Sequence, residues 1–288
     1  MKQVLITGSK GQLGSEIRQR ASRYPGFSFV FTDVEELDLT DETSIVDFFE
    51  KNRFDYCINC AAYTAVDKAE DEHDLARLIN VTATEYLART CAVHNTFLIH
   101  ISTDYVFDGK NYRPYVETDP PSPDSYYGLT KLQGEKALTQ HTSKGLIIRT
   151  SWLYSAYGNN FVKTMLRLGK SRERLGVVAD QVGTPTYAGD LAEAILDILK
   201  KGNFPNGIEI YHYSNEGAIS WYDFAQAIMR ETGRACHIDA IASKDFPAKA
   251  PRPFYSVLNK AKIKQTFRLE IPYWLDSLKK VLKQINES

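Results

Sequence analysis

The chain has 288 residues, 43% hydrophobic and 25% charged, which is typical of a folded globular protein rather than a disordered or fibrous one. Its 35 basic and 36 acidic residues give a formal net charge of -1, so no charge pattern points to nucleic acid or to an anionic membrane as a partner. No apolar run approaches the length of a membrane span or of a signal-peptide core. We therefore expect a cytoplasmic protein whose partners are small molecules or further copies of itself, a homodimer being one option.

The first half of the chain alternates short apolar runs with amphipathic segments, as strand–helix repeats around a parallel sheet do. Because such crossovers are right-handed, we predict an α/β fold, a doubly wound Rossmann-type sheet that binds ligands at the carboxyl ends of its strands. The expected strands lie near residues 2–7, 27–33, 54–60, 96–102 and 145–150. The expected helices lie near residues 12–23, 42–51, 73–94 and 127–141.

Beyond residue 150 the pattern changes to helices separated by short strands and proline-rich loops. We predict a dinucleotide-binding domain over residues 1–150 and a smaller α/β lobe, mainly for the substrate, over residues 151–288. The boundary is soft because no flexible linker marks it, and exchange of chain between the lobes stays open. Helices of the second lobe are expected near residues 159–170, 188–201, 220–232 and 272–286.

Four cysteines occur, and only Cys57 and Cys60 have a spacing that suggests metal or redox chemistry. They lie in an apolar run typical of a buried strand, where side chains three residues apart point to opposite faces. Their sulfur atoms would therefore neither share a metal nor form an unstrained bridge. All four cysteines are expected to be reduced core residues.

The first strand runs into a turn with glycines at its first, fourth and seventh positions, Gly8, Gly11 and Gly14. Glycine permits the tight turn, the close approach of backbone to a pyrophosphate and the packing of the next helix on the strand. Gln12 and Leu13 open that helix, whose free amides would face the phosphates. The segment predicts a dinucleotide site; a plain glycine turn is the alternative, and the position directly after the first strand argues against it.

Asp33 follows the second strand, at the distance where a carboxylate accepts hydrogen bonds from the adenosine ribose. A carboxylate there repels a 2'-phosphate, which favours NADH over NADPH. An ordinary turn aspartate is the alternative. Both cofactors, NADPH and NADH, therefore remain open.

Three residues carry the predicted catalysis: Thr103 at a strand end, and Tyr127 and Lys131 on one face of a helix. Hydride delivered to a carbonyl carbon leaves an alkoxide that needs a proton, and a tyrosine can supply it. A free phenol has a pKa near ~10, and the charges of Lys131 and of an oxidised nicotinamide would lower it. Lys131 would also hold the nicotinamide ribose, and Thr103 would donate to the substrate oxygen. Tyr126 competes for the role of Tyr127, but it is rotated away from Lys131.

The chain resembles the dTDP-4-dehydrorhamnose reductase family of extended short-chain dehydrogenases through most of its length. Several of the matching stretches are more specific than the glycine turn. They are residues 11–14, 59–70, 102–109, 127–135, 149–154 and 180–186.

The resemblance implies an NADPH- or NADH-dependent reduction of the C4 ketone of dTDP-4-dehydro-β-L-rhamnose to dTDP-L-rhamnose, or action on a closely related dTDP-sugar. It implies cofactor contacts along two segments that follow strands. These contacts are Asp38, Leu39, Ala61, Ala62, Tyr63 and Thr64. It implies substrate contacts from residues in both halves of the chain. These are Thr103, Asp104, Tyr105 and Trp152, with Asn160 and Gln181 as further polar contacts.

Two of the substrate residues also have a physical rationale. The flat indole of Trp152 can cover the apolar face of a deoxysugar or stack on thymine, while a core tryptophan is the alternative. Arg252, with Lys249 nearby, is expected to approach the diphosphate, because a nearly neutral protein needs a cation there; a solvated loop arginine is equally open. Glu16 matches one magnesium ligand of some relatives, but without a full ligand set no metal is predicted.

Two other functions stay open. An epimerase or dehydratase could use the same scaffold, although a 4,6-dehydratase needs an Asp–Glu pair after the strand-end threonine, and here Tyr105 follows Asp104. A regulatory subunit could retain the reductase fold without turnover, because fold and site can outlive function. Trp152 and residues 181–186 favour the enzyme.

Overall fold

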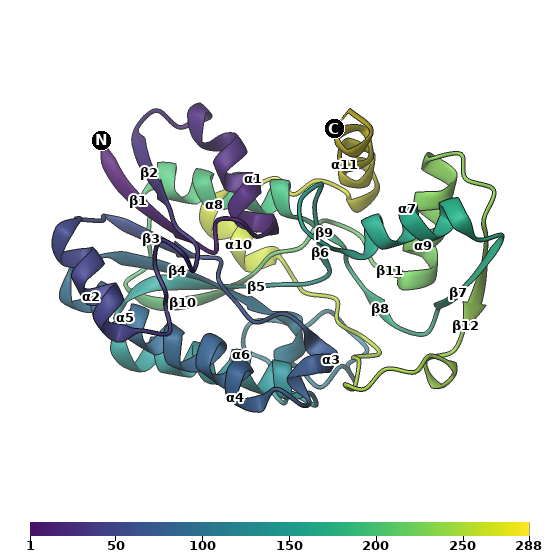
Figure 1. The fold of residues 1–288 in the computed structure, drawn as a ribbon, viewed down its shortest axis with the longest axis horizontal. Coiled ribbons are helices and arrows are strands. Elements are labelled where there is room, and N and C mark those ends of the chain that lie inside the picture. Colours follow the sequence, from purple (N-terminus) through teal and green to yellow (C-terminus); the bar gives the residue numbers. More distant parts are fainter. Residues whose placement is uncertain (288) are drawn as a thin grey trace.

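A six-stranded sheet of order β10-β5-β4-β3-β1-β2 forms the centre of the protein, whose computed structural model describes residues 1–287 (Figure 1). Every pair of neighbouring strands runs parallel, which confirms the predicted Rossmann-type sheet. The strand order reverses at β1, because β2 lies on one side of β1 and β3 lies on the other. Open α/β sheets bind their ligands at such a switch point. The strands are β1 (Lys2–Thr7), β2 (Phe27–Phe31), β3 (Tyr56–Asn59), β4 (Phe97–Thr103), β5 (Lys144–Thr150) and β10 (Gly207–His212).

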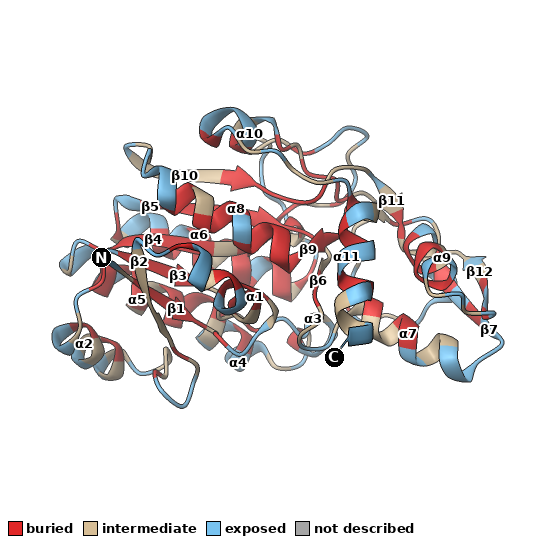
Figure 2. Ribbon diagram, turned by 90° about the horizontal axis from the view of Figure 1, so that it is seen from above, coloured by how far each residue is buried: buried red, intermediate tan, exposed pale blue. Residues whose placement is uncertain are grey.

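Helices cover both faces of this sheet, each over its own apolar core. On one face α1 (Gln12–Arg20), α8 (Ala188–Lys201) and α10 (Ala261–Phe267) pack over alternate strand residues such as Val4 and Ile6. On the other face α2 (Glu42–Lys51), α5 (Ala83–Val93) and α6 (Tyr126–His141) pack over the intervening residues, such as Leu5. Buried residues accordingly fill the sheet and the inner helix faces (Figure 2).

The two cysteines of the predicted strand lie on opposite faces, as expected. Cys57 packs in the core with Cys91, and Cys60 packs against the core on the other side of the sheet. All four cysteines are free thiols.

A second lobe has its own apolar core under α7 (Phe161–Ser171), α9 (Trp221–Glu231) and α11 (Trp274–Glu287), beside the carboxyl edge of the sheet (Figure 1). Short strand pairs complete it. They are β7 (Arg174–Val178) with β12 (His237–Ile241), β8 (Val182–Gly183) with β11 (Ile219–Ser220), and β6 (Leu153–Tyr154) with β9 (Thr186–Tyr187). After residue 150, α8 and α10 pack on the six-stranded sheet, and β10 joins it. The domain boundary expected at residue 150 stays a prediction.

The single helix expected near residues 73–94 is wrong in detail. The segment forms α4 (His73–Arg77), a π-helical turn (Leu78–Thr82) and then α5, and α3 (Val66–Ala69) precedes it. The Asn80 amide hydrogen-bonds the backbone N–H and carbonyl of Tyr63, at 2.9 and 3.1 Å. A π turn often marks a functional site, because it re-aims one residue without ending the helix.

Other boundaries differ from the predictions by a few residues. The first helix ends at Arg20 and continues as a 3-10 turn (Ala21–Arg23), and β3 begins only at Tyr56. Neither β10 nor α10 was expected from the sequence. No helix among residues 1–287 combines the length and the apolar character needed to cross a membrane.

Candidate active site

Two positions of the glycine turn between β1 and α1, Gly8 and Gly14, have no room for a side chain. Gly8 has φ +61°, and a Cβ there would lie 2.6 Å from the backbone nitrogen of Ala61. At Gly14 a Cβ would lie 2.5 Å from Cα of Ser9. Gly11 is the N-cap of α1 and offers no side-chain cap, so the first amides of the helix are left for a ligand. The turn therefore fits the pyrophosphate of a dinucleotide.

A cavity of about 290 Å³ opens beside this turn, at the carboxyl ends of β1 and β3. Seven of the predicted cofactor residues line it: Gly8, Gly11, Asp33, Asp38, Leu39, Ala61 and Ala62. The others lie around it. Leu13 is buried in the core under α1, Gln12 accepts a hydrogen bond from Asn160, Tyr63 is buried and Thr64 is exposed. Their contacts with a cofactor stay predictions.

Asp33 holds the glycine turn in place. Its carboxylate accepts hydrogen bonds from the backbone N–H groups of Lys10 at 2.8 Å and Val34 at 3.0 Å. The Lys10 ammonium in turn lies 2.6 Å from a carboxylate oxygen of Glu35. Asp33 thus has a structural task besides any contact with the adenosine ribose.

Thr103, Tyr127 and Lys131 lie around the carboxyl-terminal part of β4. Thr103 ends β4, and its hydroxyl donates to Asp104 Oδ1 at 2.9 Å. Tyr127 lies in the first turn of α6, with its ring edge-on to Tyr105 at 5.5 Å between centroids. The Lys131 Nζ is buried one turn later and donates to the carbonyl of Ile101 at 2.8 Å.

The burial of these groups sets their pKa values. Burial raises the pKa of the Tyr127 phenol, while its hydrogen bond with Thr103 lowers it. The net direction is opposite to the one expected from the sequence, because desolvation outweighs the stabilisation of a phenolate. Burial also lowers the pKa of Lys131 to about 8 and raises the pKa of Asp104 to about 6.

Tyr126, the rival acid, lies outside this group. Its ring stacks on His73 at 3.8 Å between centroids, and its backbone N–H donates to Glu70 at 2.8 Å. The geometry therefore favours Tyr127, which shares the helix face of Lys131.

A second cavity, of about 600 Å³, lies between the lobes and is lined by Tyr105, Gln181, Trp221 and Arg252 among others. The Arg252 guanidinium donates to the Tyr105 hydroxyl at 3.1 Å and pairs with Asp67 at 2.7 Å. Gln181 donates to Ser243 Oγ at 2.9 Å. Predicted substrate residues from distant parts of the chain thus share one cavity, next to Tyr127.

Two predicted substrate residues lie elsewhere. Trp152 has φ +46° and stacks on Trp221 at 3.5 Å, so that Trp221 separates it from the cavity. Asn160 caps α7, and its amide donates to Gln12 at 3.0 Å and to the Ser155 carbonyl at 2.8 Å. Their contacts with a substrate stay predictions.

Several polar residues of the site were not found from the sequence. The buried Glu135 accepts from Ser102 at 2.5 Å and pairs with Arg149 through two hydrogen bonds, at 2.9 and 2.7 Å. Asn59 and His100 lie directly behind Lys131. In the sequence, only His100 stands out, as a lone polar residue within the apolar run of β4. Asn59, Glu135 and Arg149 lie far apart in the sequence, and only the fold brings them together.

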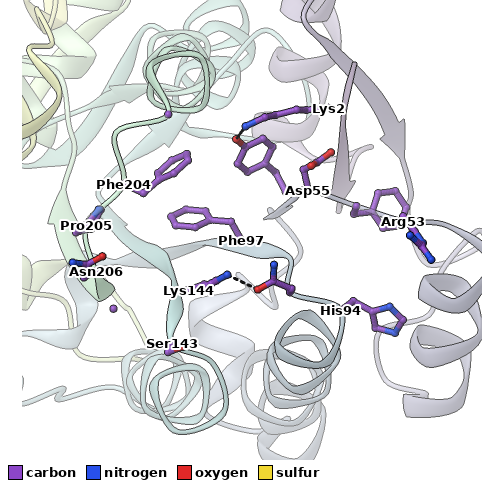
Figure 3. Close-up of a pocket in the computed structure, with 15 residues that line it drawn as sticks. Lys2, Arg53, Asp55, His94, Phe97, Ser143, Lys144, Phe204, Pro205 and Asn206 are labelled. Carbon is purple, nitrogen blue, oxygen red and sulfur yellow. Dashed lines mark hydrogen bonds between the residues drawn. The ribbon is translucent and has the colours of Figure 1, made fainter.

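A further groove, of about 960 Å³, lies at the opposite edge of the sheet, between Lys2, Arg53, Phe97 and Phe204 (Figure 3). It is formed at the amino ends of the strands, away from the glycine turn and the catalytic side chains. In parallel sheets ligands bind at the carboxyl ends. We therefore place the active site at the other edge.

The carboxylate of Glu16 is fully buried and already engaged. It pairs with Arg20 at 2.5 Å and accepts from Ser155 at 2.6 Å and from Tyr187 at 3.2 Å. Among residues 1–287, no cluster of three or more acidic, His or Cys side chains is arranged to hold a metal ion.

A glycine turn at the switch point of a parallel sheet, next to a buried tyrosine and lysine on one helix face, defines the class. The protein is a nicotinamide-dependent oxidoreductase of the extended short-chain dehydrogenase type.

Comparison with known proteins identifies the family within this class. Residues 1–287 match the family described as the RmlD substrate binding domain. A dTDP-4-dehydrorhamnose reductase of Aggregatibacter actinomycetemcomitans is 42% identical over 292 residues, which cover 98% of each chain. The chain therefore belongs to the dTDP-4-dehydrorhamnose reductase family.

Solved structures agree with this assignment. The dTDP-4-dehydrorhamnose reductase of Clostridium acetobutylicum superposes with a TM-score of 0.94 and 41% identity, over 99% of both chains. The Bacillus anthracis enzyme, solved in complex with NADP, has the same TM-score and 37% identity, over 99% of this chain and 100% of that one.

Proposed function

We propose that this chain reduces the C4 ketone of dTDP-4-dehydro-β-L-rhamnose to dTDP-L-rhamnose, with NADPH or NADH as the reductant. The observation that carries the proposal is the match to reductases along the whole chain, at 42% identity. The arrangement of Thr103, Tyr127 and Lys131 around the end of β4 supports it, with Tyr127 packed on Tyr105, which lines the second cavity.

The chain's own residues account for the proton that the reaction needs. The residues of the glycine turn and of the cavity beside it would hold the dinucleotide, which would supply a hydride to the carbonyl carbon when bound. The Thr103 hydroxyl then orients the carbonyl oxygen, and Tyr127 donates its proton to that oxygen as the new C–H bond forms. Lys131 holds the nicotinamide ribose, and a proton from water later restores the Tyr127 phenol.

The cavity between the lobes supports a nucleotide-sugar substrate. Arg252 offers a planar cation for the diphosphate. Trp221 and Phe161 line the same cavity with aromatic rings, which suit a thymine base or the apolar face of a deoxysugar. Trp152 supports Trp221 from behind through the stacked indoles.

The direct test is loss of NADPH or NADH absorbance when the purified protein meets freshly made dTDP-4-dehydro-β-L-rhamnose. We expect rapid oxidation with formation of dTDP-L-rhamnose, and the two rates rank the cofactors. Binding of both cofactors without oxidation would reject the proposal and favour another keto sugar or a regulatory subunit.

A cytoplasmic location and a homodimer complete the proposal. A biosynthetic reductase that uses a soluble dinucleotide and a nucleotide sugar fits the cytoplasm, where both occur. Light scattering of the purified protein, expected at twice the chain mass of 32.6 kDa, tests the homodimer.

A further inference from the structure

Arg252 is held on two sides by residues of the first lobe. Its guanidinium donates through Nη1 to the Tyr105 hydroxyl at 3.1 Å and through Nη2 to Asp67 Oδ2 at 2.7 Å. Arg252 and Tyr105 both line the cavity between the lobes, whereas Asp67 lies outside it, on α3. A carboxylate that the mechanism above does not use therefore helps to set the direction of the guanidinium.

Asp67 also holds the backbone of the segment that carries Arg252. Its second carboxylate oxygen, Oδ1, accepts from the backbone N–H of Ala250 at 3.0 Å. One carboxylate thus binds both the guanidinium and the main chain two residues before it. A simple surface ion pair between two mobile side chains lacks such a backbone contact, and it fixes neither partner. The double contact fixes the side chain of Arg252 relative to its own loop.

The loop of residues 247–252 takes its polar anchors from the first lobe. Among residues 1–287, its hydrogen bonds and ion pairs go to Asp67, Asp71 and Tyr105, and the chain after β12 accordingly runs back towards α3 (Figure 1). The pair of Lys249 with Asp71 is exposed on both sides, so it contributes little. Asp67 is therefore the main polar anchor of the loop.

The helix that carries Asp67 is itself tied to both parts of the proposed active site. It follows closely on residues 61–62, which line the cavity beside the glycine turn. Glu70, directly after the helix, accepts from the backbone N–H of Tyr126 at 2.8 Å, at the start of α6 and next to the catalytic tyrosine. Asp67 thus holds Arg252 against the same frame that carries the cofactor cavity and the catalytic helix.

We propose that Asp67 is a positioning residue that holds Arg252 ready to bind the diphosphate of the nucleotide sugar. The contacts with Asp67 and Tyr105 leave other N–H groups of the guanidinium to bind phosphate oxygens. A flexible side chain loses rotamer freedom when it binds a ligand, and a side chain that is already held loses less. The inference rests on the proposed function, which takes Arg252 as the diphosphate contact.

The direction of the effect distinguishes positioning from charge alone. A negative charge near the site repels a diphosphate, so by charge alone the loss of Asp67 would tighten binding. By positioning, its loss weakens binding, because the guanidinium and the loop backbone are released. The Asp67 side chain is 49% exposed and its charge is screened by solvent, whereas Arg252 is only 22% exposed. We therefore expect the positioning effect to be the larger one.

The first test is calorimetric titration of the full chain with dTDP. In Asp67→Asn the amide oxygen can still accept from Ala250, but the amide NH₂ group then faces the donors of Arg252. We expect the Kd for dTDP to rise roughly 3- to 30-fold, as for residues that share one hydrogen-bond network, with the Kd for NADPH unchanged. An unchanged or lower Kd for dTDP would overturn the proposal.

Asp71→Asn is the matched control, because it removes the same charge from a position four residues further on. Asp71 contacts the exposed Lys249 and not Arg252, so its Kd for dTDP should stay within about 2-fold of the wild type. An effect as large as that of Asp67→Asn would assign the loss to charge or to the loop as a whole, which also overturns the proposal.

The second test asks whether Asp67 acts through Arg252. The double variant Asp67→Asn with Arg252→Gln should bind dTDP no more weakly than Arg252→Gln alone, because the residue that Asp67 positions is already gone. In turnover, Asp67→Asn should raise the KM for the dTDP-sugar and leave the KM for NADPH unchanged. Additive losses in the double variant would show that Asp67 acts by another route.

The outcomes separate this inference from the proposed function. A protein that reduces no keto sugar, but shows the weaker and non-additive dTDP binding, retains the role of Asp67 and loses the proposed substrate. A protein that reduces its substrate with the same KM in Asp67→Asn keeps the function and loses this role. A wild-type protein that does not bind dTDP overturns both. If Asp67→Asn does not fold, Asp67→Ala takes its place, with the same expected direction.

Discussion

The phenol of Tyr127 has a raised pKa because it is buried, and this direction suits a reduction. A general acid must keep its proton until the substrate oxygen becomes basic, and an alkoxide is far more basic than a phenolate. The Tyr127 ring is buried and packs against Tyr105 in an edge-type contact, at 5.5 Å between ring centroids. In the reverse direction, oxidation of the alcohol, the same burial would slow proton removal.

Tyr127→Phe removes the proposed proton donor and leaves the ring packing in place. We expect turnover to fall by about 10²–10⁴-fold, the usual contribution of a general acid, while NADPH binding measured by fluorescence remains. Tyr126→Phe is the matched control, because Tyr126 stacks on His73 outside the catalytic group, and its effect should be small. The opposite pattern would assign the acid to Tyr126.

Arg252→Gln tests the proposed contact with the diphosphate. Loss of a hydrogen bond to a charged group costs about 1.5–3 kcal/mol, so the KM for the dTDP-sugar should rise by roughly 10- to 150-fold while the KM for NADPH stays the same. Lys249→Gln is the control from the same loop, since Lys249 pairs with Asp71 at the surface. Equal effects of the two substitutions would refute a specific role for Arg252.

At the scale of elements, two glycines of α6 let the helix backbone lie directly against the backbone of neighbouring segments, and this close contact positions the site. A Cβ at Gly128 would lie 2.2 Å from the carbonyl oxygen of Tyr105, and one at Gly134 would lie 2.2 Å from that of Asn80. The first contact holds Tyr127 against the end of β4. The second holds the π turn, whose Asn80 in turn fixes the backbone of Tyr63.

Gly134→Ala should therefore disturb both stability and cofactor binding. Overpacking typically costs about 1–3 kcal/mol, which urea unfolding would detect, and NADPH affinity should fall because the segment after β3 moves with Asn80. Gly26→Ala is the control, since a Cβ there has no neighbour within 4 Å. A Gly134→Ala protein with wild-type stability and affinity would contradict this account of α6.

The elements that the sequence predicted well are those defined by local patterns. The strand–helix alternation, the glycine turn and the Tyr127–Lys131 pair depend on short spacings, and the structure has them near the expected residues. The π turn was missed because its i to i+5 bonding leaves the helical periodicity almost unchanged. The chain from Asn59 through His100 to Lys131 joins three elements, so only the fold could reveal it.

At the scale of the whole molecule, the two halves of the chain are tied by buried polar contacts. Glu16 of α1 meets Ser155 and Tyr187 from beyond residue 150, and β10 completes the sheet beside β5. His212, at the end of β10, hydrogen-bonds the Tyr115 carbonyl. The two halves of the chain are thus joined by a shared sheet and by buried contacts, which explains why the composition shows no linker.

His212 makes this junction sensitive to acid. Its buried Nδ1 donates to the Tyr115 carbonyl at 3.1 Å, and Nε2 is a buried atom without a hydrogen-bond partner. Burial, and then the positive charge of Arg149, lower the pKa of His212 from 6.5 to about 3. The unfolded chain therefore binds an extra proton between these two pH values, so the free energy of unfolding falls as the pH drops below about 6.5.

His212→Asn should weaken this dependence, because the asparagine amide can still donate to Tyr115 but does not titrate. Between pH 7.5 and 5.0 we expect the variant to lose about 2 kcal/mol less unfolding free energy than the wild type, measured by urea unfolding at both pH values. Burial raises the pKa of Asp104, which changes the unfolding free energy with pH in the opposite direction. Asp104 is present in the wild type and in the variant, so its contribution cancels in the difference between them. His237→Asn, on the exposed face of β12, should follow the wild type. Parallel curves for His212→Asn and the wild type would show that another buried group controls acid unfolding.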